Sequence, residues 1–96
     1  MDATKTYQRK SNFISRNIAG ETLLVPLAGK IADLQRVIAL NAVGAFIWAQ
    51  LETPRTLDGI AAALVSAFAV DMDTARRDAM EFFGQLEAAN LIETVA

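Results

Sequence analysis

Side chains that could do chemistry are scarce in this sequence, and none of them stands in a catalytic spacing. The 96 residues include no His and no Cys, so the commonest general base, the thiolate nucleophile and the usual zinc ligands are missing. Asp71, Asp73 and Asp78 come nearest to a metal site, but a calcium loop needs Gly at its sixth position, where this chain has Arg76. Helix capping explains Asp71 and Asp73 better. We therefore expect no enzyme activity, no metal site and no cofactor.

Charge is distributed unevenly and argues against nucleic acid as the partner. Residues 1–30 carry five Lys and Arg against two acids, whereas residues 31–96 carry four Arg against nine acids. The net charge is −2, and a nucleic-acid-binding domain is usually basic. The chain has no apolar run of about 20 residues that could cross a membrane, and no apolar core of a signal peptide near Met1. We expect a cytoplasmic protein without a membrane partner.

Three strands are expected in the first half of the chain. Residues 1–11 are polar and without period, which indicates a loose N-terminal arm. Residues 12–27 are typical of a hairpin, with an apolar run on each side of a turn at Gly20-Glu21. Residues 33–40, DLQRVIAL, alternate as a third strand, and neither of its faces is cleanly apolar. Such a strand belongs at the edge of a sheet, so the three-stranded antiparallel meander ends on a free edge.

Three helices follow, and each is introduced by a strong N-cap residue, whose side chain accepts from a backbone N–H of the first turn. Asn90 is expected in a left-handed conformation after the last helix, with Leu91 folding back on it. Strands followed by helices define an α+β fold, which we expect to be one domain over residues 12–96. The three caps are Asn41 before residues 42–51, Thr56 before residues 57–68, and Asp71 before residues 72–89.

The longest expected helix, residues 72–89, has an apolar arc wider than one core requires. Projection at about 100° per residue separates a core stripe from a flank that mixes apolar and charged residues. Gly84 lies at this flank, and Gly inside a helix costs about 1 kcal/mol against Ala, which favours a close backbone approach there. Either the helix is buried on two sides, or the flank is the wall of a groove. The core stripe contains Met72, Ala75, Ala79, Phe82 and Leu86, and the flank contains Arg76, Met80, Phe83 and Glu87.

A free strand edge beside an apolar helix flank is the geometry of peptide capture by strand addition. The edge offers unpaired backbone N–H and C=O groups, to which an extended peptide adds as one more strand. Arg76 and Glu87 are expected to fix the position of the peptide along the groove through its charged side chains. Arg76→Glu is therefore expected to weaken the binding of an acidic peptide. The same free edge is also able to pair with the edge of a second copy of this chain, so a homodimer is a further alternative. The predicted peptide-binding residues are Asp33, Gln35, Arg36, Val37 and Ile38 of the strand, and Arg76, Met80, Phe83, Gly84 and Glu87 of the helix.

Four segments, in this order, resemble the PqqD family, named after pyrroloquinoline quinone biosynthesis protein D. Residues 39–48, ALNAVGAFIW, resemble the family signature LN-x-x-G/A-x-x-I-W, and residues 55–60, RTLDGI, resemble R-T-x-x-x-I. Residues 78–86, DAMEFFGQL, and residues 90–92, NLI, resemble D-V-x-x-F-L-x-x-L and a G-L-I tail. The resemblance covers about residues 12–95.

The resemblance implies a winged-helix-like domain, in which an N-terminal three-stranded meander precedes three helices. In natural-product pathways such domains are called RiPP recognition elements, and they bind the leader segment of a ribosomally made precursor peptide along the third strand and against the third helix. They present it to a modifying enzyme, often a radical SAM protein, which would be a second partner of this chain. The chain departs from the family at Glu52-Thr53-Pro54, where Asp-Gly is usual, and at Ala79, where Val is usual. Pyrroloquinoline quinone biosynthesis and other peptide pathways both stay open.

A DNA-binding winged-helix regulator is the main alternative, because the expected fold resembles one. Its recognition helix should be basic. Residues 72–89 carry two Arg against four acids, and residues 57–68 carry Asp58 and no cation. We therefore favour a non-catalytic peptide-binding chaperone over a transcriptional regulator.

Overall fold

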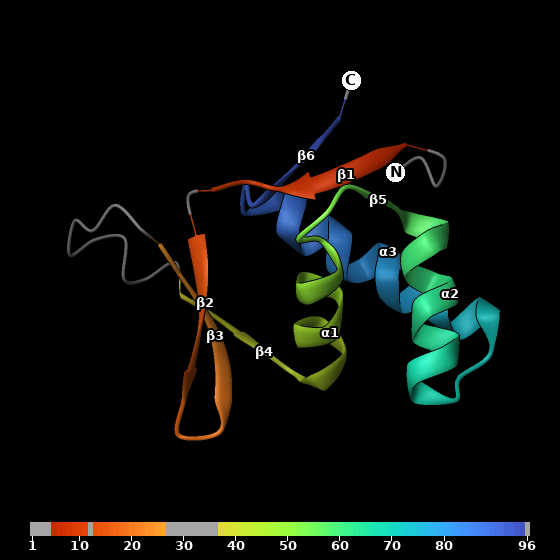
Figure 1. Cartoon of the computed structure of the whole chain (residues 1–96), viewed down its shortest axis with the longest axis horizontal. Coiled ribbons are helices and arrows are strands. Elements are labelled where there is room, and N and C mark those ends of the chain that lie inside the picture. Colours follow the sequence, from red (N-terminus) through yellow and green to blue (C-terminus); the bar gives the residue numbers. More distant parts are fainter. Residues whose placement is uncertain (1–4, 12, 27–36, 96) are drawn as a thin grey trace.

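The computed structural model describes residues 5–11, 13–26 and 37–95, which form two small sheets and three helices (Figure 1). The elements are β1 (Thr6–Arg9), β2 (Phe13–Ile18), β3 (Glu21–Pro26), β4 (Ile38–Leu40), α1 (Ala42–Gln50), β5 (Arg55–Thr56), α2 (Leu57–Phe68), α3 (Met72–Ala88) and β6 (Ile92–Thr94). One sheet has the order β2-β3-β4 and the other the order β5-β1-β6, with antiparallel pairs throughout. The α+β class is confirmed, and so is a meander that precedes three helices.

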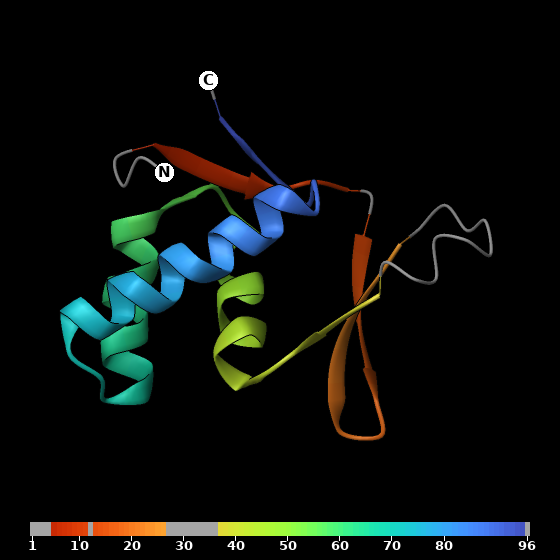
Figure 2. The ribbon, with the colours of Figure 1, turned by 180° about the vertical axis from the view of Figure 1, so that it is seen from behind.

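The meander β2-β3-β4 begins with a tight hairpin. β2 and β3 pair from Phe13↔Pro26 to Ile18↔Glu21, so the two-residue turn is Ala19-Gly20, one residue earlier than predicted. Both turn residues have positive φ, 53° and 83°, as a type I′ hairpin turn requires. In Figures 1 and 2 the hairpin projects to one side of the helices, and β4, which pairs with β3, leads into α1.

The N-terminal segment is a strand at the centre of the second sheet, so the predicted loose arm over residues 1–11 is wrong for the residues that the structure describes there. β1 pairs with β5 on one side and with β6 on the other. Tyr7 is 2% exposed, and its ring meets Phe83 of α3 edge-on, with 5.3 Å between the ring centroids. The sequence pattern did not indicate this strand, because Tyr7 is the only buried side chain of β1. The strands with which β1 pairs, β5 and β6, lie far along the chain.

The three predicted caps are confirmed, which explains why the helices begin where they do. Each cap side chain accepts from the backbone N–H three residues later, at 2.8 Å for Asn41, 3.0 Å for Thr56 and 2.7 Å for Asp71. Asn90 has φ 62°, and the N–H of Leu91 donates to the carbonyl of Leu86. This is the predicted left-handed end of the last helix.

Asp71 makes the stability of the domain depend on acid in a predictable direction. The backbone N–H of Thr74, and then its hydroxyl, hold the pKa of the Asp71 carboxyl below its ordinary value of 3.8. Because the folded pKa is the lower one, the carboxylate stabilises the fold above about pH 3.8, and this contribution is lost as the pH falls through the folded pKa. Asp71→Asn keeps a strong cap that does not titrate.

We therefore expect the free energy of unfolding to fall less steeply below pH 3.8 in Asp71→Asn than in the natural chain. Urea unfolding across an acid pH series measures this difference, with Asp73→Asn as the control, since Asp73 lies in the same first turn without being the cap. Parallel curves for the natural chain and Asp71→Asn would contradict the assignment.

The core lies where the helices meet β1, and it decides which face of α3 is buried. Ala75, Ala79 and Leu86 are buried as predicted, but Phe82 is half-buried and Phe83 is fully buried. The prediction that put Phe82 in the core stripe and Phe83 on an open flank is therefore wrong. The buried residues Ala75, Ala79, Phe83 and Leu86 lie within about 80° of one another at about 100° per residue, so one face of α3 is buried, and Tyr7 of β1 packs on its Phe83 side. Burial on two sides, with Met80 covered, is not observed in the described residues, since Met80 is exposed.

Candidate functional site

The strand β4 forms one edge of its sheet within the residues that the structure describes. It pairs with β3 from Thr22↔Leu40 to Leu24↔Ile38, and the described residues place no strand on its other side. A strand in this position offers backbone N–H and C=O groups to a further strand. The predicted free edge is thus present over the part of β4 that can be seen.

The predicted edge residues are described only in part. Val37 directly precedes β4 and Ile38 begins it, and both are half-buried. Asp33, Gln35 and Arg36 lie outside the described residues. Their predicted contribution to peptide binding therefore stays a prediction.

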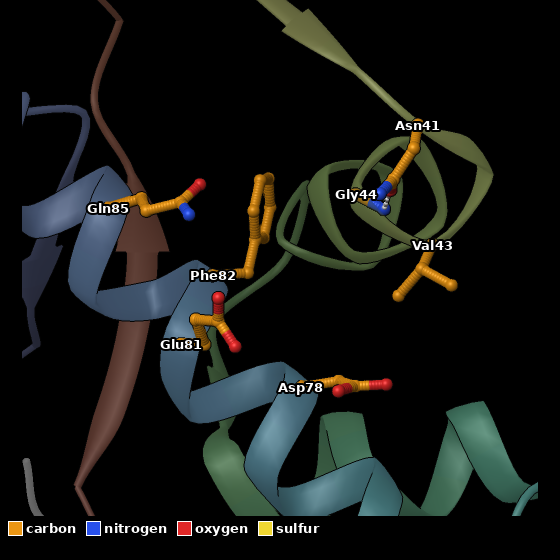
Figure 3. Close-up of a pocket in the computed structure, with 7 residues that line it drawn as sticks. All are labelled: Asn41, Val43, Gly44, Asp78, Glu81, Phe82 and Gln85. Atoms are coloured by element: carbon orange, nitrogen blue, oxygen red, sulfur yellow. Dashed lines mark hydrogen bonds between the residues drawn. The ribbon is translucent and has the colours of Figure 1, made fainter.

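A pocket lies between the beginning of α1 and the middle of α3, next to the end of β4. In Figure 3 the ring of Phe82 stands between the two helices, with Glu81 directly before it on α3 and Asp78 one turn before it. The pocket has a volume of about 270 Å³. β4 ends directly before Asn41, the N-cap of α1, so the edge strand leads to the rim. The lining residues are Asn41, Val43, Gly44, Asp78, Glu81, Phe82 and Gln85.

Gly44 allows Phe82 to lie close to α1. A Cβ at position 44 would come within 3.2 Å of the Phe82 ring and within 3.3 Å of the Asn41 side-chain oxygen. Either neighbour would have to give way, because so short a contact is repulsive. The Gly at this place in the L-N-x-x-G motif thus keeps the capping oxygen and the aromatic ring together at the bottom of the pocket.

The flank of α3 that the sequence analysis selected lies away from this pocket. At about 100° per residue, Arg76, Met80 and Glu87 lie roughly 120–160° round the helix axis from Phe82. Arg76 instead forms an ion pair with Asp58 of α2, at 3.2 Å between guanidinium and carboxylate. All three side chains are exposed, Met80 to 48%.

The two remaining predicted residues on this flank differ from each other in burial. Phe83 is buried against Tyr7 and offers no surface to a peptide, so its prediction as a groove residue is wrong. Gly84 is exposed, and a Cβ there would meet nothing within 4 Å. No close backbone approach therefore explains this Gly in the described part of the molecule, contrary to the reason given for it.

Sequence reasoning missed the residues of α3 that do line the pocket. Asp78, Glu81, Phe82 and Gln85 follow a spacing of three, one and three residues, which places them on one helix face. That spacing was visible, but the choice between the two faces needed the position of β1. On the α1 side the sequence signal is Gly44. It belongs to the L-N-x-x-G motif, which indicated the family but not the pocket.

Trp48 is a core residue that lies next to the β5-β1-β6 sheet. It is 2% exposed, as expected of a core residue, and the Arg9 guanidinium lies 5.1 Å from the centre of its ring. Arg9 also donates to the Trp48 carbonyl at 3.3 Å. This pair fastens β1 to α1, so the indole reports on the docking of β1.

The groups that could act in catalysis are not assembled in the described residues. Their core contains no buried polar or charged side chain, and no three His, Cys, Asp or Glu side chains in them are placed to hold a metal ion. No helix in the same residues is long and apolar enough to span a bilayer. What the arrangement offers is a strand edge beside a pocket with an aromatic floor, which suits binding of an extended chain.

Comparison with known proteins relates this arrangement to a family and to a solved complex. A family model described as "Coenzyme PQQ synthesis protein D (PqqD)" matches residues 21–92. Comparison with curated protein sequences finds no match. Among solved structures, TbiB1 in complex with the TbiA(beta) leader peptide is similar to this chain, with 28% sequence identity and a TM-score of 0.73. The match covers 93% of this chain and 98% of that chain.

Proposed function

The chain belongs to the PqqD family, and we propose that it is a non-catalytic RiPP recognition element, which captures the leader segment of a ribosomally made precursor peptide by strand addition. The winged-helix-like fold is shared with TbiB1 over nearly the whole of both chains. TbiB1 was solved in complex with a leader peptide. The likeness therefore supports the same kind of ligand for this chain.

The observation that carries the proposal is the open edge of β4 next to the pocket between α1 and α3. An added strand obtains main-chain hydrogen bonds from β4, which provide affinity with little dependence on sequence. Its side chains alternate between the two faces of the sheet, so those on one face can enter the pocket. We propose that the site consists of the edge at Val37 and Ile38 together with the pocket on α3.

The partner enzyme belongs to the proposal as well. A non-catalytic domain needs a second protein to modify the peptide that it holds, and we propose a radical SAM enzyme in that position. The family description supports a place in the synthesis of a coenzyme or a related peptide product. The predicted cytoplasmic location and the homodimer through the β4 edge both stay predictions.

A DNA-binding role is disfavoured by charge. α3 carries two Arg against four acids, and Arg76 is already paired with Asp58 of α2. Duplex DNA attracts proteins mainly through Lys and Arg contacts to its phosphates. Neither α2 nor α3 presents the basic face that such contacts need.

We expect the domain to bind peptides and to leave duplex DNA unbound. Peptides about a dozen residues long, selected from a random display library, and the TbiA(beta) leader provide two independent probes. On titration of isotopically labelled protein, bound peptide should shift the amides of residues 37–40 and 78–85. Random-sequence duplex DNA at the same concentration should shift none.

Two results would overturn the proposed function. One is salt-sensitive micromolar DNA binding without peptide affinity, which would restore the regulator. The other is peptide binding with shifts confined to Arg76, Met80 and Glu87, which would move the site to the flank first selected. An unrelated acidic domain of similar size serves as the control for nonspecific peptide binding.

A further inference from the structure

The pocket between α1 and α3 joins an apolar floor to an acidic wall. Phe82 and Val43 provide the apolar surface, and Gly44 lets the Phe82 ring lie against α1. Asp78 and Glu81 stand beside the ring on α3, with Asp78 half-buried and Glu81 exposed (Figure 3). A side chain that enters this space can contact the Phe82 ring and the two carboxylates beside it.

The two carboxylates are not neutralised within the described part of the chain. None of the seven lining residues carries a positive charge, and no described cation forms an ion pair with Asp78 or Glu81. The ion pair of α3 joins Arg76 to Asp58, on another side of the helix. Arg77 lies beside Asp78 and one turn before Glu81 on α3, but it is exposed and forms no ion pair with either carboxylate among the described residues. The residues that line the pocket thus present two carboxylates and no positive charge.

Lys and Arg have the matching chemistry. Their alkyl stems cover apolar surface while the charged head stays at the rim, and a guanidinium also lies well over an aromatic ring. An acidic side chain at the same place would face two like charges, which costs affinity. This is opposite to the acidic peptide that Arg76 suggested from the sequence alone.

We propose that the pocket selects leader segments with a basic residue, Arg above Lys, at the position that points from the added strand toward Phe82. The inference rests on the proposed function, because it assumes a peptide strand on β4. It goes beyond that function by assigning charge selectivity to Asp78 and Glu81. The order Arg before Lys follows from the aromatic floor, over which the planar guanidinium stacks.

Selection from a random peptide display library tests the proposal. With the natural chain, we expect enrichment of Arg and Lys at one position of the selected peptides. Asp78→Asn/Glu81→Gln should abolish this enrichment while the variant remains folded, since neither side chain belongs to the core. Asp73→Asn/Glu93→Gln removes the same two charges from exposed positions outside the pocket and should keep the enrichment.

A synthetic peptide then isolates the charge. Citrulline in place of the selected Arg keeps the shape of the side chain and removes its positive charge. We expect this exchange to weaken binding to the natural chain roughly 3- to 10-fold at low salt, less at high salt, because two partly solvated pairs are lost. For Asp78→Asn/Glu81→Gln the difference between the Arg and the citrulline peptide should be much smaller, because only the interaction of the guanidinium with the Phe82 ring remains.

The outcomes separate this proposal from the proposed function. Selected peptides that shift the amides of residues 37–40 but show neither basic enrichment nor a citrulline effect would overturn the charge selectivity and leave peptide capture intact. A library that yields no peptide bound at β4 would overturn peptide capture, and the selectivity with it. Basic enrichment that survives in Asp78→Asn/Glu81→Gln would place the selectivity elsewhere and refute the role of these two carboxylates.

Discussion

Replacing Tyr7 with Ala is expected to lower the free energy of unfolding by about 3–5 kcal/mol, the range for large-to-small substitutions of buried aromatic residues. Tyr7 is 2% exposed and packs edge-on against Phe83, which is fully buried in α3. A domain of this size has a total stability of about 5–15 kcal/mol. The midpoint of thermal unfolding should therefore fall by roughly 12 °C or more.

Tyr7→Phe is the matched control, because it keeps the ring and removes only the hydroxyl. We expect it to cost at most about 1.5 kcal/mol, the upper end for one net hydrogen bond. Deletion of the chain through Arg9 should unfold the domain, since β5 and β6 lose the strand that joins them. Circular dichroism measures the unfolding, and the fluorescence of Trp48, over which Arg9 lies, reports whether β1 remains docked.

A dispensable arm would give the opposite result. If the deleted chain melted within a few degrees of the natural one, the polar N-terminus would be the loose segment that its sequence suggests, and the pairing of β1 with β5 and β6 would be wrong. Tyr7→Ala in the undeleted chain separates the loss of the Tyr7 side chain from the loss of the backbone pairs of β1. It removes the anchor and leaves the backbone pairs of β1 available.

A single N-methyl group is expected to weaken the binding of a peptide at β4 at every second position of the peptide, and to have little effect at the positions between. In a β ladder, alternate residues of a strand direct their N–H groups to one neighbour, and the residues between direct theirs away. An N-methyl group at a paired residue removes a donor and leaves a β4 carbonyl without its partner. The cost of such a buried unsatisfied group is about 1–3 kcal/mol, which corresponds to roughly a 5- to 150-fold loss of affinity.

The residues between the paired ones serve as internal controls in the same peptide. Their N–H groups point to solvent, so N-methylation there should change affinity by only about 3-fold, provided that the extended backbone is kept. Fluorescence anisotropy with a complete N-methyl series measures the pattern. Losses clustered at positions three and four apart would indicate a helix in a groove instead of a strand, and uniform small losses would indicate binding through side chains alone.

The hairpin and the helix starts followed from the sequence because local interactions decide them. Asn41, Thr56 and Asp71 each satisfy a backbone N–H only three residues away, so their effect does not depend on the rest of the fold. Asn90 ends α3 by its own left-handed backbone. The position of the strand edge followed as well, since a strand with no clean apolar face belongs at the side of a sheet.

The orientation of α3 could not be derived in the same way. Phe82 and Phe83 are adjacent and equally apolar, and the periodicity of the helix allows either to face the core. The choice depends on Tyr7, which lies far away in the sequence and fills the space beside Phe83. Phe82 and Phe83 lie on opposite sides of the buried stripe of Ala75, Ala79 and Leu86, about 100° apart, and the prediction took the Phe83 side as the groove. The predicted site was therefore turned away from the pocket.

The sequence by itself determined an acidic α+β domain of the PqqD family with an edge strand before its first helix, because composition, caps and motif spacing are properties of neighbouring residues. Only the tertiary structure decided that residues 6–9 belong to the fold and that Asp78, Glu81 and Phe82 face α1. Both depend on contacts between segments that are far apart in the chain. Which face of a helix is buried depends on the elements that pack against it, and these elements are brought together only in the tertiary structure.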